Sequence, residues 1–507
     1  MESHLNTTAT GPSSSSARRL AGQTAMAAAV LGSGLTAATA SAEKQQSAEE
    51  LLARAQALIA QAEAQQAKET QEVKETKAEA IERVLDDAER RSSRPTFLND
   101  EAAPFFTGFE DGKFTLRDED GRFSLQPNLQ LQMRYVANYN SVEGLDSDNQ
   151  MPIGDTGFAQ DFQGGGELRR VKLGIKGNAF DKDLKYDVKF AFNRNAADTD
   201  DDLVLENGFI TYKPEEGLFG AEGLGFQIGQ FKDPTFFEES TSSTRQLWAD
   251  RSIVNEVLGG GQTDFIQSAG LWYEQDRFKA FVHVNDGLNS DNTNFTDDFD
   301  DLDFGVAARF DVLLLGDSFK PFRDFTALGT EEKIARVGGG VFVDINEGFM
   351  GVGDATNSFL ATLDASYECD KGFAFFIAGL LAYNDDEMTR DDGTGTLITT
   401  SSDGVDFGGI VKVSQLLDAD AGWEVFGGYD FIIFDQADVN GEDFYHEAVL
   451  GVNKYWFGHS VKMTIDAACA INGTPTALGS GSGIGYQRDG MSDDPQLAIR
   501  GQFQLLL

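Results

Sequence analysis

Charged and apolar side chains alternate along residues 167–195. Arg170, Lys172 and Lys176 share one parity, and apolar residues fill most of the positions between them. A period of two residues is the period of an extended strand, whose successive side chains point to opposite faces. The interruption FDKD at 180–183 is short enough for a tight hairpin. The pattern therefore predicts two antiparallel strands, each with one polar and one apolar face.

The same alternation recurs from residue 123 to the end of the chain and predicts an even number of strands, sixteen in all. Most connections alternate between short turns and longer polar loops, which is typical of an outer-membrane β-barrel. The exceptions are a long link between the eighth and ninth strands and a brief loop after the thirteenth. We expect strands near 123–139, 166–179, 182–195, 203–214, 223–233, 265–275, 277–287, 302–314, 334–346, 357–369, 372–384, 404–416, 422–435, 443–455, 459–471 and 495–507.

The apolar face of the sheet requires contact with hydrocarbon, and in hydrocarbon the sheet must close into a barrel. In hydrocarbon every backbone N–H and C=O needs a partner within the protein, so a sheet can span a bilayer only when it leaves no edge. A soluble sandwich or propeller would also alternate, but it would expose too much apolar surface unless a second sheet covered it. We therefore predict an all-β fold, a transmembrane antiparallel 16-stranded β-barrel over residues 123–507 that is in contact with outer-membrane lipid.

The first 122 residues differ in composition from the barrel. Residues 1–42 carry Arg18 and Arg19, an apolar run and small residues before Glu43, which predicts a secretory signal peptide or, alternatively, a disordered leader. Residues 43–92 are rich in Ala, Glu, Gln and Lys, which predicts a helical or coiled-coil segment or a solvated spacer. Residues 93–122 are expected to form a linker. Beyond residue 42 no apolar run is long enough for a membrane-spanning helix.

The two cysteines are not expected to form a disulfide. Cys369 and Cys469 fall on the tenth and fifteenth predicted strands, where both take positions on the apolar face. No CxxC pair or Cys/His spacing suggests a metal site. We predict free thiols that face lipid.

Three segments resemble a known family. ELRRVKLGIKG, LKYDVKFAF and GFQIGQFKDPTFFEESTSSTRQLWADRS resemble the phosphate-selective porins O and P, whose members have a strand ending in a GQFK-like motif followed by a TSS and an acidic-Arg-Ser segment. The resemblance is clearest over 123–287. It implies a sixteen-stranded barrel that assembles as a homotrimer and passes small hydrophilic solutes or ions, including anions such as phosphate, by passive diffusion.

The resemblance also implies the position of the pore constriction. Residues 233–262 follow the fifth strand, where general porins fold a loop into the lumen. Opposed charges across a pore would orient passing ions. Alternatively, Asp250 and Arg251 pin the loop to the wall by ion pairs. The candidate constriction residues are Lys232, Glu238, Glu239, Arg245, Asp250 and Arg251.

Basic residues are expected to line the lumen, where charge stays hydrated. A basic strip in a pore attracts anions. The formal net charge of −42 argues against strong anion selectivity, so the preferred ion stays open. The candidate pore-lining residues are Arg134, Arg170, Lys172, Lys176, Lys185 and Lys189.

Two other functions remain as alternatives. An outer-membrane hydrolase is the less favoured of them, because only His283 among the four histidines has an inward place on a strand and no Ser-His-acid arrangement or HExxH motif is apparent. The barrel could also serve as a structural anchor, with residues 43–92 in contact with the cell wall. Acidic runs such as 198–202 are read as solvated loops or, alternatively, as binding sites for calcium or magnesium, although they lack the spacing of a calcium loop. No cofactor, metal or nucleic acid is implied.

Overall fold

The computed structural model describes most of the chain beyond residue 105. The chain divides into units 1–102 and 103–507, and all described residues lie in the second unit. The predicted signal peptide at 1–42 and the helical segment at 43–92 therefore lie outside the described residues and stay predictions. The described residues are 106–110, 113–140, 151–153, 157–159, 162–192, 203–259, 265–287, 302–347, 353–391, 397–418, 421–437, 442–475, 478, 484–487 and 495–507.

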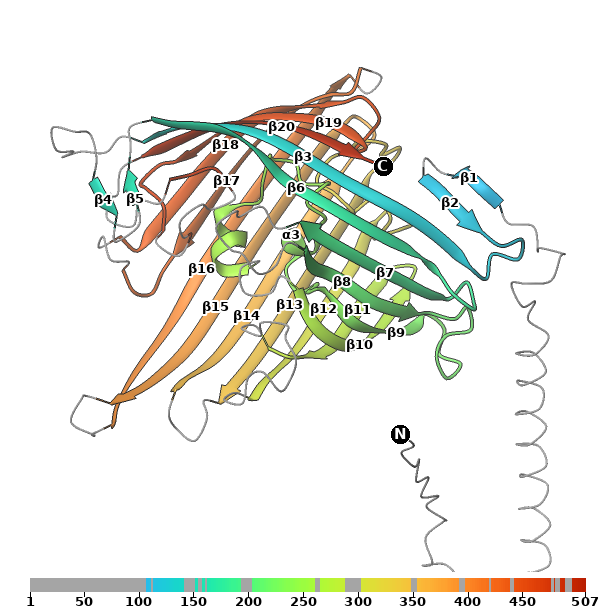
Figure 1. The fold of residues 1–507 in the computed structure, drawn as a ribbon, viewed down its shortest axis with the longest axis horizontal. Helices are drawn as coiled ribbons and strands as arrows, with labels where there is room; N and C mark the ends of the chain where they lie inside the picture. Colours follow the sequence, from blue (N-terminus) through green and yellow to red (C-terminus); the bar gives the residue numbers. More distant parts are fainter. Residues whose placement is uncertain are drawn as a thin grey trace, which may run out of the picture. The chain divides into compact units, whose positions relative to one another are not determined.

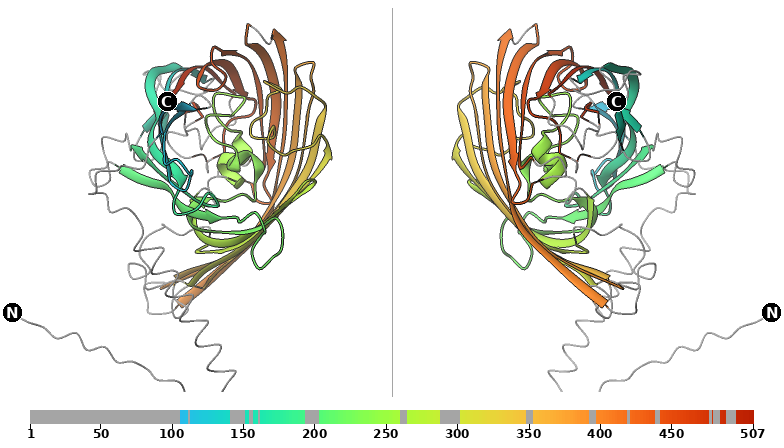
Figure 2. Two further views of the ribbon diagram at one scale, coloured as in Figure 1. Left: turned by 90° about the vertical axis from the view of Figure 1, so that its right-hand side faces the viewer. Right: turned by 90° about the vertical axis from the view of Figure 1, so that its left-hand side faces the viewer.

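Sixteen strands of the described chain form one closed antiparallel sheet (Figures 1 and 2). Each strand pairs with the next along the chain, and the last pairs with the first through residues such as Gln502 and Arg134. The predicted barrel is therefore confirmed. Its strands are β3 (Ser124–Asn140), β6 (Phe162–Asn178), β7 (Leu184–Phe192), β8 (Leu203–Tyr212), β9 (Leu224–Lys232), β10 (Phe265–Gln275), β11 (Phe278–Asn285), β12 (Leu302–Leu315), β13 (Ile334–Glu347), β14 (Gly353–Glu368), β15 (Phe373–Asp391), β16 (Leu397–Asp418), β17 (Trp423–Ile433), β18 (Phe444–Tyr455), β19 (Val461–Ala470) and β20 (Gln496–Leu506).

Four short strands were not expected from the sequence. β1 (Phe106–Glu110) and β2 (Lys113–Arg117) form a hairpin within the predicted linker. β2 pairs with the first residues of β3, on the same edge of β3 that β20 occupies farther along. The hairpin thus continues the wall beyond the end of β20. β4 (Met151–Ile153) and β5 (Gly157–Ala159) form a separate two-stranded sheet.

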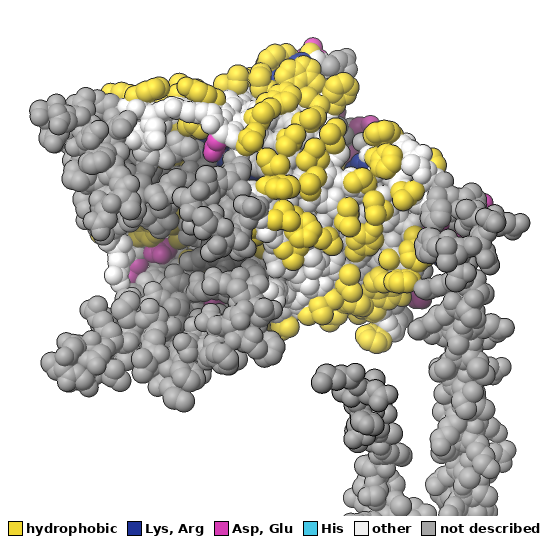
Figure 3. Space-filling model, in the orientation of Figure 1, with side chains coloured by type: hydrophobic (Ala, Val, Ile, Leu, Met, Phe, Trp, Pro, Cys, Tyr) yellow, Lys and Arg dark blue, Asp and Glu magenta, His cyan; other side chains and the backbone are white. Residues whose placement is uncertain are grey.

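The two faces of the wall differ as the alternation predicts. On β19 the side chains of Lys462, Thr464 and Asp466 are buried inside the barrel, whereas Ile465 is exposed on its outside. Leu450 on the neighbouring strand is 70% exposed. Apolar side chains cover much of the outer surface in Figure 3. An uncovered apolar belt of this extent requires a nonaqueous environment.

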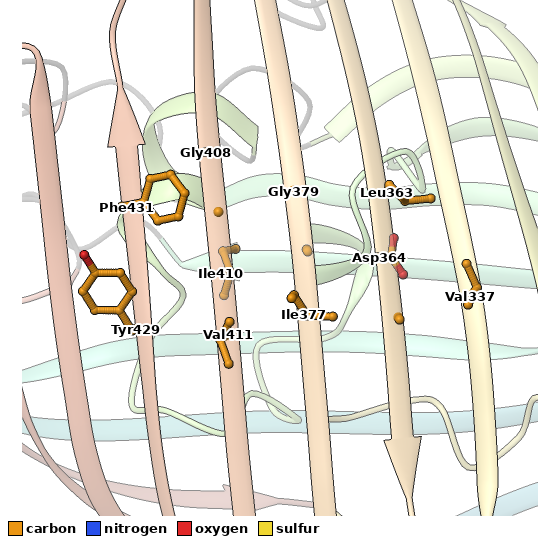
Figure 4. A pocket seen from close by; sticks show the side chains of 13 residues that line it. Val337, Leu363, Asp364, Ile377, Gly379, Gly408, Ile410, Val411, Tyr429 and Phe431 are labelled. Carbon is orange, nitrogen blue, oxygen red and sulfur yellow. The ribbon is translucent and has the colours of Figure 1, made fainter.

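Paired glycines make a groove in this outer surface. Gly379 on β15 and Gly409 on β16 are opposite each other in the register, between Leu363 and Phe431. A Cβ added at Gly379 would meet nothing within 4 Å, whereas one added at Gly409 would lie 2.5 Å from the ring of Phe431. The groove has a volume of about 590 Å³, and Figure 4 shows Gly379 and Phe431 in its lining.

The cysteine prediction is only partly correct. Both thiols are free. Cys469 lies on β19 with the outward residues, but Cys369 lies in the turn after β14 and is only 7% exposed. The prediction of a lipid-facing thiol is therefore wrong for Cys369, because β14 ends at Glu368, one residue earlier than expected, and the side chain of Cys369 is buried.

Candidate pore constriction

The segment after β9 folds into the barrel. Residues 233–259, here called the constriction loop, contain the short helix α3 (Phe237–Ser240) and one π-helical turn, η1 (Asn255–Gly259). Figure 2 shows this segment inside the ring of strands. Trp248 at the centre of the loop is 1% exposed. The loop is therefore packed against the inner face of the wall.

Asp250 fixes the loop to β3 and β6. Its carboxylate accepts hydrogen bonds from Arg134 at 2.9 Å, Arg169 at 2.8 Å and Arg170 at 2.9 Å, and its side chain is 1% exposed. Burial alone would raise the pKa of Asp250, but the three guanidinium groups outweigh it and hold that pKa well below its usual range. Asp250 therefore stays ionised. Asp250 and the three arginines together hold the loop to the wall and are here called the Asp250 clamp.

A β-bulge brings Arg169 into this clamp. In the register Gln132 pairs with Arg170 and Met133 pairs with Leu168, so Arg169 has no partner on β3. Strict alternation from Arg170 would have placed Arg169 on the outer face. A guanidinium on the lipid side of a strand is costly, and a bulge lets two consecutive residues face inward. The pair of adjacent arginines was the sequence signal that could have predicted Arg169 as a clamp residue.

A second buried carboxylate ties the loop to the opposite wall. Glu238 forms an ion pair with Lys412 of β16, and neither side chain is exposed. Glu238 also accepts hydrogen bonds from the backbone N–H of Ser252 at 3.1 Å and from its hydroxyl at 2.5 Å. The Lys412 ammonium lies 4.2 Å from the ring centroid of Trp248. One carboxylate thus holds two parts of the loop and the wall together.

Arg251 acts within the loop. Its guanidinium is 3.1 Å from the carboxylate of Glu239 and donates to the backbone carbonyls of Glu239 at 3.3 Å and Thr241 at 3.1 Å. Glu239 also pairs with Lys232 at the end of β9. These charges are satisfied by one another, so they shape the loop and do not form an open pair across the pore. Asp250 thus forms ion pairs between the loop and the wall, whereas the bonds that Arg251 makes among the described residues stay within the loop.

Glycines on the inner wall allow the loop to approach closely. A Cβ added at Gly428 of β17 would lie 2.2 Å from a ring carbon of Trp248, and one added at Gly408 of β16 would lie 2.4 Å from Val254. Backbone groups of the loop bond to the same side of the barrel: the Ala249 N–H donates to Asp466 at 2.9 Å. The loop and the inward residues of β15 to β18 form one apolar cluster. The loop therefore occupies the lumen beside β15 to β18.

The inward lysines of β6 and β7 are arranged differently. Lys172 forms an ion pair with Glu206 of β8. Lys176, Lys185 and Lys189 have no ion pair within the described residues, and none of the three is buried. The predicted pore-lining residues therefore separate into paired and unpaired charges. Arg134 and Arg170 form ion pairs with Asp250, and Lys172 forms one with Glu206, whereas the other three lysines lie on an uncovered wall.

A second inward segment was missed in the sequence. Residues 316–333, the long link between β12 and β13, contain the buried residues Phe322 and Phe325. Asp324 of this inner link lies 3.2 Å from the guanidinium of Arg245 and 3.0 Å from the imidazole of His459. The candidate Arg245 thus joins the constriction loop to the inner link. The unusual length of the link was the available signal, but its apolar residues have no regular period.

The structure contains a Ser-His-Asp contact, although the sequence shows no Ser-His-acid arrangement. Ser268 lies 3.0 Å from one imidazole nitrogen of His283, and Asp233 lies 3.1 Å from the other. The sequence does not reveal this contact, because the three residues lie on two strands and a loop. His283 and Asp233 are fully buried, and the Ser268 hydroxyl donates to the Val284 carbonyl at 2.9 Å. The contact anchors the start of the constriction loop and has no access for a substrate. Across the described ranges no group of three or more His, Cys, Asp or Glu could hold a metal ion.

The comparison with protein families gives the same assignment as the geometry. Residues 138–310 match the family model described as phosphate-selective porin O and P, a stretch that runs from β3 to β12 and contains the whole constriction loop. This match over part of the chain, together with the closed barrel, identifies an outer-membrane porin that is similar to this family. The porin is a channel and not an enzyme. Among the described residues no helix is long and apolar enough to cross a membrane.

The chain was also compared with solved structures. The outer membrane channel DcaP of Acinetobacter baumannii is 12% identical, with a TM-score of 0.47 over 79% of this chain and 100% of that chain. An anion-selective porin from Comamonas acidovorans is 12% identical, with a TM-score of 0.48 over 76% and 100% of the two chains. Pseudomonas putida OprB is 11% identical, with a TM-score of 0.46 over 76% and 94%. No curated protein matches the porin.

Proposed function

We propose that small hydrophilic solutes and ions diffuse between the constriction loop and the wall formed by β6 to β9, and that anions are preferred. The observation that carries this proposal is the group of inward lysines Lys176, Lys185 and Lys189, which have no ion pair within the described residues. The loop packs its apolar side against β15 to β18 and leaves these lysines uncovered. A water path along β6 and β7 would therefore be lined by positive charge.

The acidic balance of the whole chain does not argue against this path. The charge that acts on a passing ion is the charge within a Debye length, about 8 Å at physiological ionic strength. The acidic run 198–202 lies between β7 and β8 in the sequence and outside the described residues. On the wall itself, Asp187 accepts a hydrogen bond from Asn207 at 3.2 Å, and Glu206 is paired with Lys172. On this wall the three lysines carry more charge than Asp187, whose hydrogen bond from a neutral amide does not cancel its charge.

Charge reversal on the uncovered wall should change the ion preference. We expect Lys176→Glu with Lys189→Glu to shift the reversal potential in asymmetric KCl toward cation preference. The control is Lys182→Glu with Lys371→Glu, two exposed lysines in turns, which should shift it much less. Single-channel recordings in planar bilayers measure both. An unchanged reversal potential in the Lys176/Lys189 variant would contradict the proposed path.

We also propose a homotrimer as the functional unit, as the family resemblance implies. One solved structure, that of the outer membrane protein OmpT of Vibrio cholerae, is described in a trimer form. The bilayer recordings test this assembly too. Each insertion should close in three equal steps, whereas insertions that close in one step would count against three pores per unit.

A further inference from the structure

We propose that a cavity between the constriction loop and β10 to β12 binds small aromatic carboxylates on their way through the pore. This inference rests on the proposed function and names a class of solute for it. The cavity has a volume of about 420 Å³, which lies within the range of small-molecule sites. Its walls come from three parts of the porin: the constriction loop, the inward faces of the strands and the inner link at Phe322 and Arg323.

The cavity is lined by five cationic residues and one acidic residue. Three of the cations are already paired: Lys232 with Glu239, Arg245 with Asp324 at 3.2 Å, and Arg309 with Asp311 at 2.7 Å. The remaining two have no ion pair within the described residues. The lining cations are Lys232, Arg245, Lys279, Arg309 and Arg323, and the acidic residue is Asp311.

Lys279 keeps its charge available although Asp311 is its register partner on β12. Asp311 accepts hydrogen bonds from Arg309 at 2.7 and 3.0 Å and from Arg336 at 2.7 Å. Both of its oxygens are therefore engaged by guanidinium groups. A carboxylate that enters the cavity could accept a charge-assisted hydrogen bond from the Lys279 ammonium without displacing a partner.

Aromatic rings beside Lys279 give the cavity an apolar side. Trp272 stacks on Phe281 with ring centroids 4.1 Å apart, and the Lys279 ammonium lies 5.2 Å from the Trp272 centroid. Phe237 and Phe322 form part of the lining from the loop and the inner link. A solute with an aromatic body can pack on these rings while its carboxylate meets Lys279. Inorganic phosphate and acetate carry the charge without the ring, so they should bind more weakly.

Current block by benzoate tests the site. Purified wild-type porin in planar bilayers should show a reduced current at benzoate concentrations well below those at which acetate or inorganic phosphate has the same effect. Lys279→Met should raise the half-blocking concentration of benzoate about tenfold, which is the loss of one hydrogen bond to a charged group. Lys279→Arg should retain most of the block. Trp272→Leu should weaken the block by benzoate and leave that by acetate unchanged.

Lys371→Met is the matched control, because it removes an exposed lysine from the turn between β14 and β15. This variant should be blocked like the wild type. Equal block by benzoate and acetate, or an unchanged benzoate block in Lys279→Met, would overturn the site while a normal conductance leaves the porin function in place. A wild-type protein without ion conductance would instead contradict the proposed function.

Discussion

Asp250→Asn should open the pore and lower the stability of the barrel. The change removes the charge that three arginines of β3 and β6 share, and those cations would remain in a buried site. Removal of one partner from a buried ion pair costs about 3–5 kcal/mol. We expect the loop to detach from this wall, so single-channel conductance should rise and the urea midpoint of unfolding should fall.

Asp276→Asn is the control for this change. Asp276 is an exposed carboxylate in the turn between β10 and β11. Its neutralisation should leave both conductance and the unfolding midpoint near the wild-type values. If Asp250→Asn had the conductance and midpoint of the wild type, the clamp would not hold the loop.

Gly428→Ala should have the second-largest effect. The new methyl group would lie 2.2 Å from the ring of Trp248 and 2.5 Å from the backbone carbonyl of Val411. The carbonyl belongs to the neighbouring strand and cannot move far, so the tryptophan must shift. Overpacking of this kind costs about 1–3 kcal/mol. We expect a lower unfolding midpoint together with increased exposure of Trp248, measured as a red shift of the summed tryptophan fluorescence relative to the wild type.

Gly379→Ala is the matched substitution on the outer face. A Cβ added there meets nothing within 4 Å. The variant should fold and fluoresce like the wild type. Equal destabilisation by the two substitutions would mean that loss of glycine from a strand, and not contact with the loop, is responsible.

The strands could be predicted because the two sides of the wall meet different media. That difference forces a period of two, and the pairing of β20 with β3 follows once sixteen strands are counted. The hairpin of β1 and β2 escaped prediction because each strand has only five residues. The inner link escaped it because Phe322 and Phe325 have no period that an isolated sequence could reveal.

The structure shows where the candidate residues lie, but their roles in a constriction and in lining the pore stay predictions. The family motif located the constriction loop and its charged residues. The partners of those residues depend on the three-dimensional register: the bulge that turns Arg169 inward and the contact of Glu238 with Lys412, 174 positions later, leave no local pattern. The sequence therefore could not distinguish charges that form ion pairs, such as Arg170, from unpaired charges, such as Lys176.

Adjacent spin labels on β6 test the central claim that one wall separates lipid from a water-filled lumen. A nitroxide at Ile175, which is exposed on the outer face, should be relaxed mainly by oxygen dissolved in the bilayer. A nitroxide at Lys176 should be relaxed mainly by a water-soluble nickel chelate. Equal accessibility of the two labels to both reagents, in protein reconstituted into vesicles, would contradict the account.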